Sequence, residues 1–412
     1  MDIKKNINGE LKDIKDNVYS YISKIFKRGN VDDVFNKDTV DEKDIEKLSY
    51  DFFEFKKNNI LCENTLIDLE IFEGIGKDKH NTIFNYLDRT ETKMGKYLLK
   101  KILENPLTDI KILNRRQSII KKINTDKEFK TNIINKLDII KKKEKKILWL
   151  WKDLNDETEY LFNMVYFQNR FLKWLNKSEI AMKLYNYYVI IFSPIYGILS
   201  PIFIVLSPFI FLKFYFKTEI NLGLYLKLIK IAFTGVGNLF KTDINSLNGD
   251  FTLSIANIAS VVVWITFYIY SLFSNINSAI NTNRIINIIH TKLNDISKYI
   301  KEGFTLLEIT EKEILKESLL YECKVEKHFN ILWNNIFETE PNIYSNKGLI
   351  LKTYNIISEN KHKLMSIIKY ISNIDCFISI EKLLHEGYNY STFLIDKKPI
   401  LNITNLFNPV LG

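Results

Sequence analysis

Two long stretches without a charged residue constrain this chain more than any other feature. They run from Leu184 to Leu212 and from Phe251 to Asn283, in a chain of 412 residues that is otherwise rich in lysine and acidic residues. About 20 apolar residues suffice for a helix to cross a hydrocarbon core roughly 30 Å thick. We therefore predict two membrane-spanning helices, at about 190–212 and 254–275, that form a hairpin. The alternative is that both stretches are buried core helices of a large soluble protein.

The first stretch repeats a Ser-Pro pair, at Ser193, Ser200 and Ser207. A proline inside a helix frees the carbonyl four residues before it, and in lipid that carbonyl needs a hydroxyl or a neighbouring helix as its partner. Because seven residues make nearly two helical turns, the three pairs share one face. We expect a curved or kinked span whose serines and neighbouring helix bind the freed carbonyls.

The flanking segments predict how the chain sits in the membrane. Residues Leu222 to Phe240 are apolar but carry Lys227 and Lys230, which favours an interfacial or re-entrant helix over a third crossing. The N-terminus lacks the apolar core of a signal peptide. Two spans place both chain ends on one side, and basic flanks favour the cytosolic side. We predict a multi-pass membrane protein with both ends cytosolic and membrane lipid as a partner.

The charge balance is compatible with more than one partner. A net charge of +9, from 58 Lys+Arg and 49 Asp+Glu, fits nucleic acid or an anionic membrane surface, and it also fits a solvated lysine-rich exterior. The densest basic run gives the candidate contacts for phosphate or lipid, which are Lys141, Lys142, Lys143, Lys145 and Lys146. The alternative for this run is a solvated helix face beside a buried aromatic cluster.

The sequence offers no pattern for catalysis or metal binding. The five histidines are isolated and the three cysteines lack metal-ligand spacing, so we predict reduced thiols and no metal site. The nearest string to a phosphate-binding loop, Gly235 to Thr242, has Phe240 in place of the second glycine. We therefore expect no catalytic residue and no cofactor-binding residue in this chain.

Residues 65–123 have the clearest local pattern. Asp88, Thr90 and Thr92 cluster where a helix could start, and Asp88 with Glu91 has the spacing of a capping box, with Asp in place of Ser or Thr. A stripe of apolar residues then follows at helical spacing, namely Met94, Tyr97, Leu98 and Ile102. Gly95 inside this helix predicts a close approach of another backbone. Pro106 ends the helix, and a second amphipathic helix is expected after Thr108.

This segment resembles the core domain of the MutS family of DNA mismatch-repair ATPases. The family pattern is a leucine-rich run, "T-L-x-x-L-E-I-F", followed by "L-D-x-T-x-T-x-x-G-x-x-L-L", then by "P-L-T-D-I" and an arginine-bearing helix. The residues that carry the match, which we interpret as a structural motif, are Thr65, Leu69, Leu87, Asp88, Thr90, Thr92, Gly95, Pro106, Leu107 and Arg115. The C-terminal end is similar to the last core helix and first ATPase strands of the family, although Asn408 replaces a usual histidine.

The resemblance implies an all-α fold, a MutS-like core with lever helices, an inserted two-helix transmembrane hairpin and a few β-strands at the C-terminal end. The implied divisions are an N-terminal helical segment (1–60), the first part of the core (61–150), an outgoing lever helix (151–183), the membrane region (184–283), a returning lever helix (284–345), the last part of the core (346–392) and the start of an ATPase domain (393–412).

The function that this resemblance implies is that of a membrane-anchored homologue, DNA-binding and related to mismatch repair. Its implied partners are double-stranded DNA and either a second copy of the chain or a polypeptide that supplies the ATPase. ATP and Mg²⁺ are implied only for an ATPase domain that these residues do not include. The mismatch-reading domain is also expected to be missing, and we interpret Phe52 as a core residue rather than a base-stacking wedge. The alternative function is a membrane scaffold or tether that keeps the architecture without DNA contact.

Overall fold

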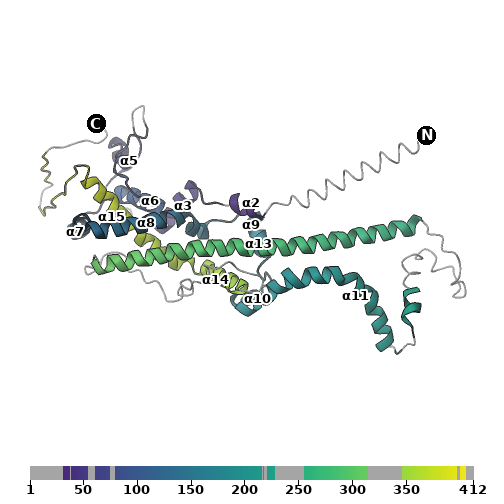
Figure 1. Ribbon diagram of the computed structural model, residues 1–412. Coiled ribbons are helices and arrows are strands. Elements are labelled where there is room, and N and C mark those ends of the chain that lie inside the picture. Colours follow the sequence, from purple (N-terminus) through teal and green to yellow (C-terminus); the bar gives the residue numbers. More distant parts are fainter. Residues whose placement is uncertain are drawn as a thin grey trace, which may run out of the picture. The chain divides into compact units, whose positions relative to one another are not determined.

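A computed structural model of the chain describes residues 31–37, 39–53, 61–74, 79–215, 217, 220–227, 255–313, 346–396 and 400–404 (Figure 1). For residues 205, 255–261 and 311–313 it describes the backbone only. The chain divides into two compact units. Unit 1 comprises Met1–Tyr160, Ile288–Asn342 and Lys352–Gly412, and unit 2 comprises Leu161–Asn287 and Ile343–Leu351.

The described part of unit 1 is helical. Its elements are α2 (Val31–Lys37), α3 (Glu42–Phe52), α4 (Glu63–Asp68), α5 (Ile83–Leu87), α6 (Lys93–Glu104), α7 (Ile110–Thr125), α8 (Lys127–Leu148), η1 (Trp149–Trp151), η8 (Lys361–Leu364) and α15 (Met365–Leu384). The long helix α13 (Ile255–Glu313) and the helices α9 (Asp156–Asn163) and α14 (Lys347–Glu359) each contribute residues to both units.

Helix α15 is the centre of unit 1. It packs against α6, α7 and α8, and α6 packs in turn against α3. Every residue from Tyr370 to Ser379 is buried, so all faces of this part of the helix are covered. A helix that is buried all round belongs to the interior of a core. The core of unit 1 therefore closes around a helix from the last part of the chain.

Most of the local predictions for the first core segment are confirmed in this unit. Met94 and Leu98 on α6 are 1% and 3% exposed, whereas Tyr97 and Ile102 of the predicted stripe are half-buried. Helix α6 ends at Glu104, before Pro106, and α7 begins after the capping residue Asp109. Phe52 is buried with its ring 5.0 Å from that of Trp151, which confirms it as a core residue.

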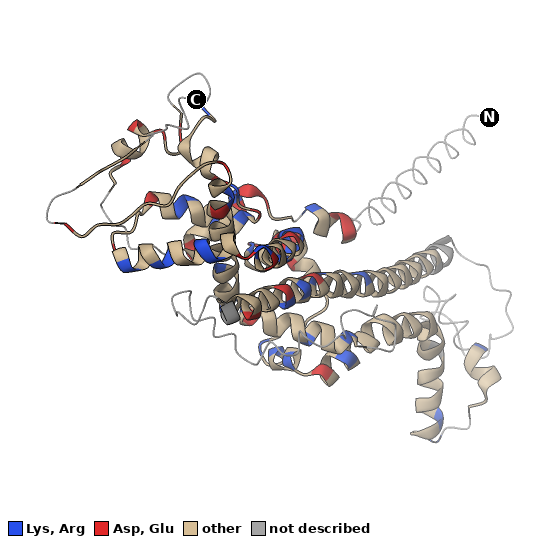
Figure 2. Cartoon of the chain, turned by 60° about the vertical axis from the view of Figure 1, so that its left-hand side comes forward, with Lys and Arg blue, Asp and Glu red and all other residues tan. Residues whose placement is uncertain are grey.

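Unit 2 contains a nearly continuous helical stretch. Its parts are η2 (Lys173–Lys177), α10 (Glu179–Tyr187), the π-helical turn η3 (Tyr188–Phe192) and α11 (Ser193–Phe214). Helix α11 contains Pro201 and Pro208 and bends along its length (Figure 1). Figure 2 shows charged residues along the helices of unit 1, whereas α11 is almost free of them.

The carbonyl that Pro201 frees has the serine partner that the Ser-Pro pattern predicts. Pro201 removes the amide that would bind the Gly197 carbonyl, and the hydroxyl of Ser200 donates to that carbonyl at 2.9 Å. The next carbonyl, of Ile198, accepts from the hydroxyl of Tyr268 on α13 at 3.0 Å. The prediction that a serine binds a freed carbonyl is confirmed at Gly197. Pro201 does not free the Ile198 carbonyl, so the bond from the neighbouring helix does not test the second part of that prediction.

Two expectations differ from what the structure describes, and a third is met in part. Residues 391–396 and 400–404, in the region expected to contain β-strands, have no regular structure. Residues 151–183 do not form one lever helix, because α9 ends at Asn163 and the chain then forms a loop and η2 before α10. Within the described residues, one helical stretch, Glu179–Ile204, is long and apolar enough to cross a membrane, a criterion of length and composition alone. The second span and the multi-pass location remain predictions.

Several expectations fall outside the described residues. They are the phosphate-loop-like string Gly235 to Thr242, most of the apolar segment Leu222 to Phe240, residues 314–345 of the returning lever and Asn408.

Candidate functional site

The N-terminus of α6 is held by two buried carboxylates from distant helices. Thr92 caps the helix, and its hydroxyl oxygen accepts from the amide of Gly95 at 3.0 Å. The carboxylate pair, which we define as Asp375 of α15 and Glu144 of α8, binds four consecutive backbone amides. The amides of Glu91 and Thr92 donate to Asp375 at 2.9 and 2.7 Å, and those of Lys93 and Met94 donate to Glu144 at 2.7 and 2.8 Å.

These contacts satisfy the backbone groups that a helix start leaves without a partner. The first amides of any helix have no carbonyl within the helix to bind, and a negative charge is favoured there by the helix dipole. Thr92 adds a further bond, since its hydroxyl donates to Asp375 at 2.7 Å. The carboxylate pair thus fixes both the start of α6 and the position of α15 and α8 against it.

Gly95 allows the carboxylate of Asp375 to approach this closely. A Cβ atom at position 95 would lie 2.3 Å from Oδ2 of Asp375 and 2.7 Å from Oγ1 of Thr92. Separations of this size are far inside van der Waals contact. The prediction of a close approach at Gly95 is confirmed, but the group that approaches is a carboxylate and not a backbone.

Burial changes the ionisation of the carboxylate pair. Loss of water contact raises the pKa of Glu144 to about 7 and that of Asp375 to about 6, although the amide hydrogen bonds act in the opposite direction. Around them, Lys382 and Lys141 lower the pKa of Glu91 through hydrogen bonds to its carboxylate. Glu144 and Asp375 inside the site therefore take up protons at a higher pH than usual, whereas Glu91 at its edge stays ionised to a lower pH.

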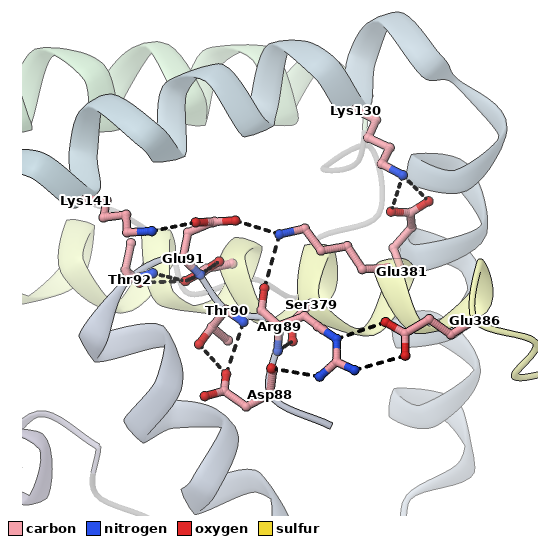
Figure 3. A network of polar contacts seen from close by, with 12 residues as sticks. Asp88, Arg89, Thr90, Glu91, Thr92, Lys130, Lys141, Ser379, Glu381 and Glu386 are labelled. Carbon is pink, nitrogen blue, oxygen red and sulfur yellow. Dashed lines mark hydrogen bonds and ion pairs between the residues drawn. The ribbon is translucent and has the colours of Figure 1, made fainter. Parts of the chain in front are cut away.

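A row of polar residues on α15 and in the turn after it binds the segment before α6 (Figure 3). The row is Asp375, Ser379 and Lys382, which lie on one face of α15, and Glu386, two residues after the helix ends. Ser379 accepts from the amide of Arg89 at 2.8 Å, and Lys382 donates to the Arg89 carbonyl at 3.2 Å. Glu386 binds the Arg89 guanidinium through both oxygens, at 2.9 and 3.0 Å. These contacts fix the backbone of residues 89–92, before α6, against α15 and the turn that follows it.

The predicted capping box at Asp88 and Glu91 is wrong. Asp88 follows the end of α5, and its carboxylate accepts from the amide and the hydroxyl of Thr90 at 3.1 and 2.6 Å. Glu91 instead pairs with Lys141 at 2.9 Å and Lys382 at 2.7 Å. The helix starts four residues later than the capping pattern implies, because Asp375 holds the amides of Glu91 and Thr92 in a non-helical segment.

The structure brings together half of the motif residues. Those at or beside the carboxylate pair and the polar row are Leu87, Asp88, Thr90, Thr92 and Gly95, with the Leu87 carbonyl 3.4 Å from the Ser379 hydroxyl. The others lie elsewhere along the segment. Thr65 is in α4, Leu69 is its exposed C-cap, Pro106 and Leu107 lie between α6 and α7, and Arg115 is in α7.

Most of the basic run on α8 is engaged in ion pairs inside unit 1. Lys141 pairs with Glu91 at 2.9 Å, Lys142 with Asp138 at 2.6 Å and Lys143 with Asp295 at 2.5 Å. Lys145 and Lys146 are exposed. The pairs of Lys141 and Lys143 join α8 to other segments of unit 1, whereas Lys142 pairs within α8. All the lysines of the run except Lys143 are exposed to solvent.

The carboxylate pair does not follow from the sequence patterns described above. Glu144 lies within the basic run 141–146, and an acid among lysines is expected to face water. Asp375 had a signal that could have been used, because it is an acidic residue within an otherwise apolar helical segment, where a charge needs a partner. The sequence around Asp375 and Glu144 does not indicate which backbone amides these acids bind.

This arrangement positions the backbone and has no reactive group aimed at a substrate. The carboxylates are occupied by amides and a hydroxyl, and the described residues contain no group of three His, Cys, Asp or Glu side chains that could hold a metal ion. The site is therefore a structural junction of three helices.

Together these contacts define unit 1 as a helical core module that is closed by a helix from much later in the chain. Residues 64–155 match the family MutS domain III. This range contains α6, α7, α8 and Glu144, whereas Asp375 lies outside it. The chain is therefore related to the MutS family through this domain, and the expected family relationship is confirmed.

Individual relatives match about a fifth of the chain. DNA mismatch repair protein MutS of Caldicellulosiruptor saccharolyticus is 36% identical over 87 residues, which is 19% of this chain and 10% of the relative. The protein of the same name from Caldicellulosiruptor bescii is 35% identical over 88 residues, 20% of this chain and 10% of the relative. That of Finegoldia magna is 37% identical over 76 residues, 18% of this chain and 9% of the relative. The chain thus spans about a tenth of the length of these curated relatives, and no solved structure matches it.

Proposed function

We propose that this chain is a membrane-anchored MutS homologue that binds DNA in mismatch repair or a related DNA transaction. The observation that carries the proposal is the match of residues 64–155 to MutS domain III, together with the convergence of its motif residues on one buried junction. A junction this specific holds the core helices at fixed angles. Such rigidity suits a core from which longer helices extend.

Exposed apolar surface supports the membrane anchor. The stretch Glu179–Ile204 is long enough to span, and 6% of its most apolar part is buried, whereas a core helix of a soluble protein is mostly buried. In α13, Val262, Ile265 and Phe267 are also exposed. We propose that α11 and the first part of α13 cross the membrane as a hairpin, joined by the contact between Tyr268 and the Ile198 carbonyl.

The partners of this proposal are lipid, double-stranded DNA and a second copy of the chain or a polypeptide with an ATPase domain. In this proposal ATP and Mg²⁺ are assigned to that ATPase domain, and no step is assigned to them in this chain.

DNA binding by the purified full chain in detergent micelles tests the first part of this proposal. Contacts to phosphates release counterions, so the affinity for duplex DNA should fall at least tenfold between about 50 and 200 mM salt. Absence of binding at about 50 mM salt would remove the DNA function. The membrane anchor is tested separately, because an inserted chain stays in the membrane fraction after an alkaline carbonate wash, whereas a peripheral one is released.

The second candidate function is a membrane scaffold or tether without DNA contact. It is favoured by the ion pairs of Lys141, Lys142 and Lys143, which direct most of the densest basic run toward carboxylates of the same chain. Retention in the carbonate wash without salt-dependent DNA binding is the result expected for this function.

A further inference from the structure

We propose that the loop of residues 167–176 in unit 2, whose residues from Lys173 onward belong to the short helix η2, is a membrane-interface anchor that binds the anionic lipid headgroups around the start of the span. This inference rests on the proposed membrane anchoring. It adds a specific contact surface and a lipid chemistry to that proposal.

The loop is closed by a side chain at its base. Asn176 is 4% exposed, and its amide group makes two bonds to the backbone of Phe167. The Phe167 amide donates to Oδ1 at 3.0 Å, and Nδ2 donates to the Phe167 carbonyl at 3.1 Å. Near the tip, the amides of Phe171 and Leu172 donate to the side chain and carbonyl of Asn169, at 3.0 and 2.8 Å. These bonds give the loop a defined shape without burying its outer side chains.

The tip of this loop presents apolar and cationic side chains together. Phe171 is 84% exposed, Trp174 is 66% exposed and Leu172 is 41% exposed. Arg170 and Lys173, beside them in the sequence, are exposed as well. Three large apolar side chains at the tip of an ordered loop are unfavourable in water, at roughly 25 cal/mol for each Å². Aromatic rings with adjacent cations are the composition that favours the headgroup region of a bilayer.

The position of the loop identifies lipid as its partner. The candidate span begins at Glu179, five residues after Trp174. From there an exposed apolar stripe continues at four-residue spacing along α10, η3 and α11, formed by Ile180, Leu184, Tyr188, Phe192 and Tyr196. The loop therefore continues the surface that the proposed span presents to the acyl chains, and a bilayer that receives the stripe also meets the loop.

The same side chains could stack on nucleic acid bases, since exposed aromatics with cations also bind single strands. The continuous apolar stripe argues against that partner, because aliphatic Ile180 and Leu184 gain nothing from stacking and are favoured by hydrocarbon. Binding of DNA at this loop is kept as an outcome of the test.

The test uses quenching of tryptophan fluorescence by brominated lipids in vesicles that contain the full chain. Vesicles of phosphatidylcholine alone are compared with vesicles that contain about 30% phosphatidylserine. Trp264 on α13 reports the span and Trp174 reports the loop, so each contribution is obtained as the difference between the natural chain and Trp264→Phe or Trp174→Phe. Both contributions should be quenched, and the Trp174 contribution should increase with phosphatidylserine.

Charge neutralisation tests the headgroup contact. One cation near an anionic surface favours the membrane-bound loop about fivefold. Arg170→Gln with Lys173→Gln should therefore weaken binding of the loop to the anionic surface about 25-fold. The increase of Trp174 quenching with phosphatidylserine should then disappear. Lys145→Gln with Lys146→Gln, a matched pair of exposed lysines on α8, should leave that effect unchanged.

The outcomes separate this inference from the proposal that it rests on. Quenching of Trp264 without quenching of Trp174 overturns the loop anchor and leaves the span standing. Absence of both overturns the membrane function as well. Short single-stranded DNA that protects Trp174, with no quenching by lipid, assigns the loop to nucleic acid instead.

Discussion

Gly95 is the residue at which one added methyl group should matter most. The Cβ of alanine would lie 2.3 Å from Oδ2 of Asp375, so the carboxylate must withdraw from the amides of Glu91 and Thr92. We predict that Gly95→Ala lowers the free energy of unfolding by about 2 to 3 kcal/mol, although alanine is the better helix former. Urea titration of the full chain in detergent micelles measures this change.

Gly223→Ala is the matched control, because nothing lies within 4 Å of a Cβ at position 223. It should be neutral or stabilising by up to about 1 kcal/mol. Equal effects of the two substitutions would show that Asp375 does not depend on the space at Gly95.

The carboxylate pair predicts a specific dependence of stability on pH. Burial raises the pKa of Glu144 from 4.5 to about 7 and that of Asp375 from 3.8 to about 6. The folded core therefore keeps protons that the unfolded chain has released. Their contribution to stability is complete below about pH 4 and is lost as the pH rises through about 6 to 7. Glu144 alone accounts for about 3 kcal/mol over this range.

Glu144→Gln should flatten the decline in unfolding free energy between about pH 4.5 and 7, measured by urea titration at a series of pH values. Glu91→Gln is a control of opposite sign. Because Lys382 and Lys141 lower the pKa of Glu91, its contribution is lost at acid pH, and its removal should leave the slope above pH 5 in place. An unchanged slope in Glu144→Gln contradicts the assignment.

At the scale of elements, the beginning of α6 shows what local pattern can and cannot predict. The apolar spacing of Met94 and Leu98 was enough to predict the buried face of the helix. The cluster of Asp88, Thr90 and Thr92 includes the capping residue Thr92, so the region of the helix start was predicted. The capping box was wrong, since the spacing of Asp88 and Glu91 satisfies a local rule that a distant carboxylate overrides. The partners of the segment, Asp375 and Glu144, lie 284 and 51 residues away in two of these bonds, and a single sequence holds no information on such pairings.

The contact between α11 and α13 depends on a second glycine. A Cβ at Gly197 would lie 2.9 Å from Nδ2 of Asn275 and 3.5 Å from Leu272. We predict that Gly197→Val separates the helices at this turn, so the bond between Tyr268 and the Ile198 carbonyl is lost. Backbone amides of residues 198–206 should then exchange hydrogen at least about tenfold faster in detergent micelles.

Gly223→Val controls for the cost of a β-branched residue in a helix, since that position has open space around it. Exchange in α11 should not change in this variant. Equal protection in Gly197→Val and in the natural chain would show that α11 does not pack on α13 through this glycine.

At the scale of the molecule, the residues that match the family model are fewer than the residues that form the folded module. Residues 64–155 carry the MutS domain III pattern, but their core is filled by α15, at residues 365–384. The sequence indicated both segments, by motif at one end and by weaker similarity at the other. It could not show that they share one interior, because burial of Ile371 and Ile374 among α6, α7 and α8 is a property of the assembled helices.

The last prediction follows from this shared interior. A fragment of residues 31–160 lacks the helix that binds its amides at Glu91 and Thr92, so it should not unfold cooperatively by circular dichroism. Adding a fragment of residues 347–392 should restore a cooperative transition.

In that second fragment, Asp375→Ala leaves buried donors without partners and should weaken association by about 2 to 4 kcal/mol, or at least tenfold. Asn373→Ala, whose amide bonds only to the Lys369 carbonyl of the same helix, should have a much smaller effect. Cooperative unfolding of the first fragment alone, or equal binding by the two variants, would show that α15 is not required to close this core.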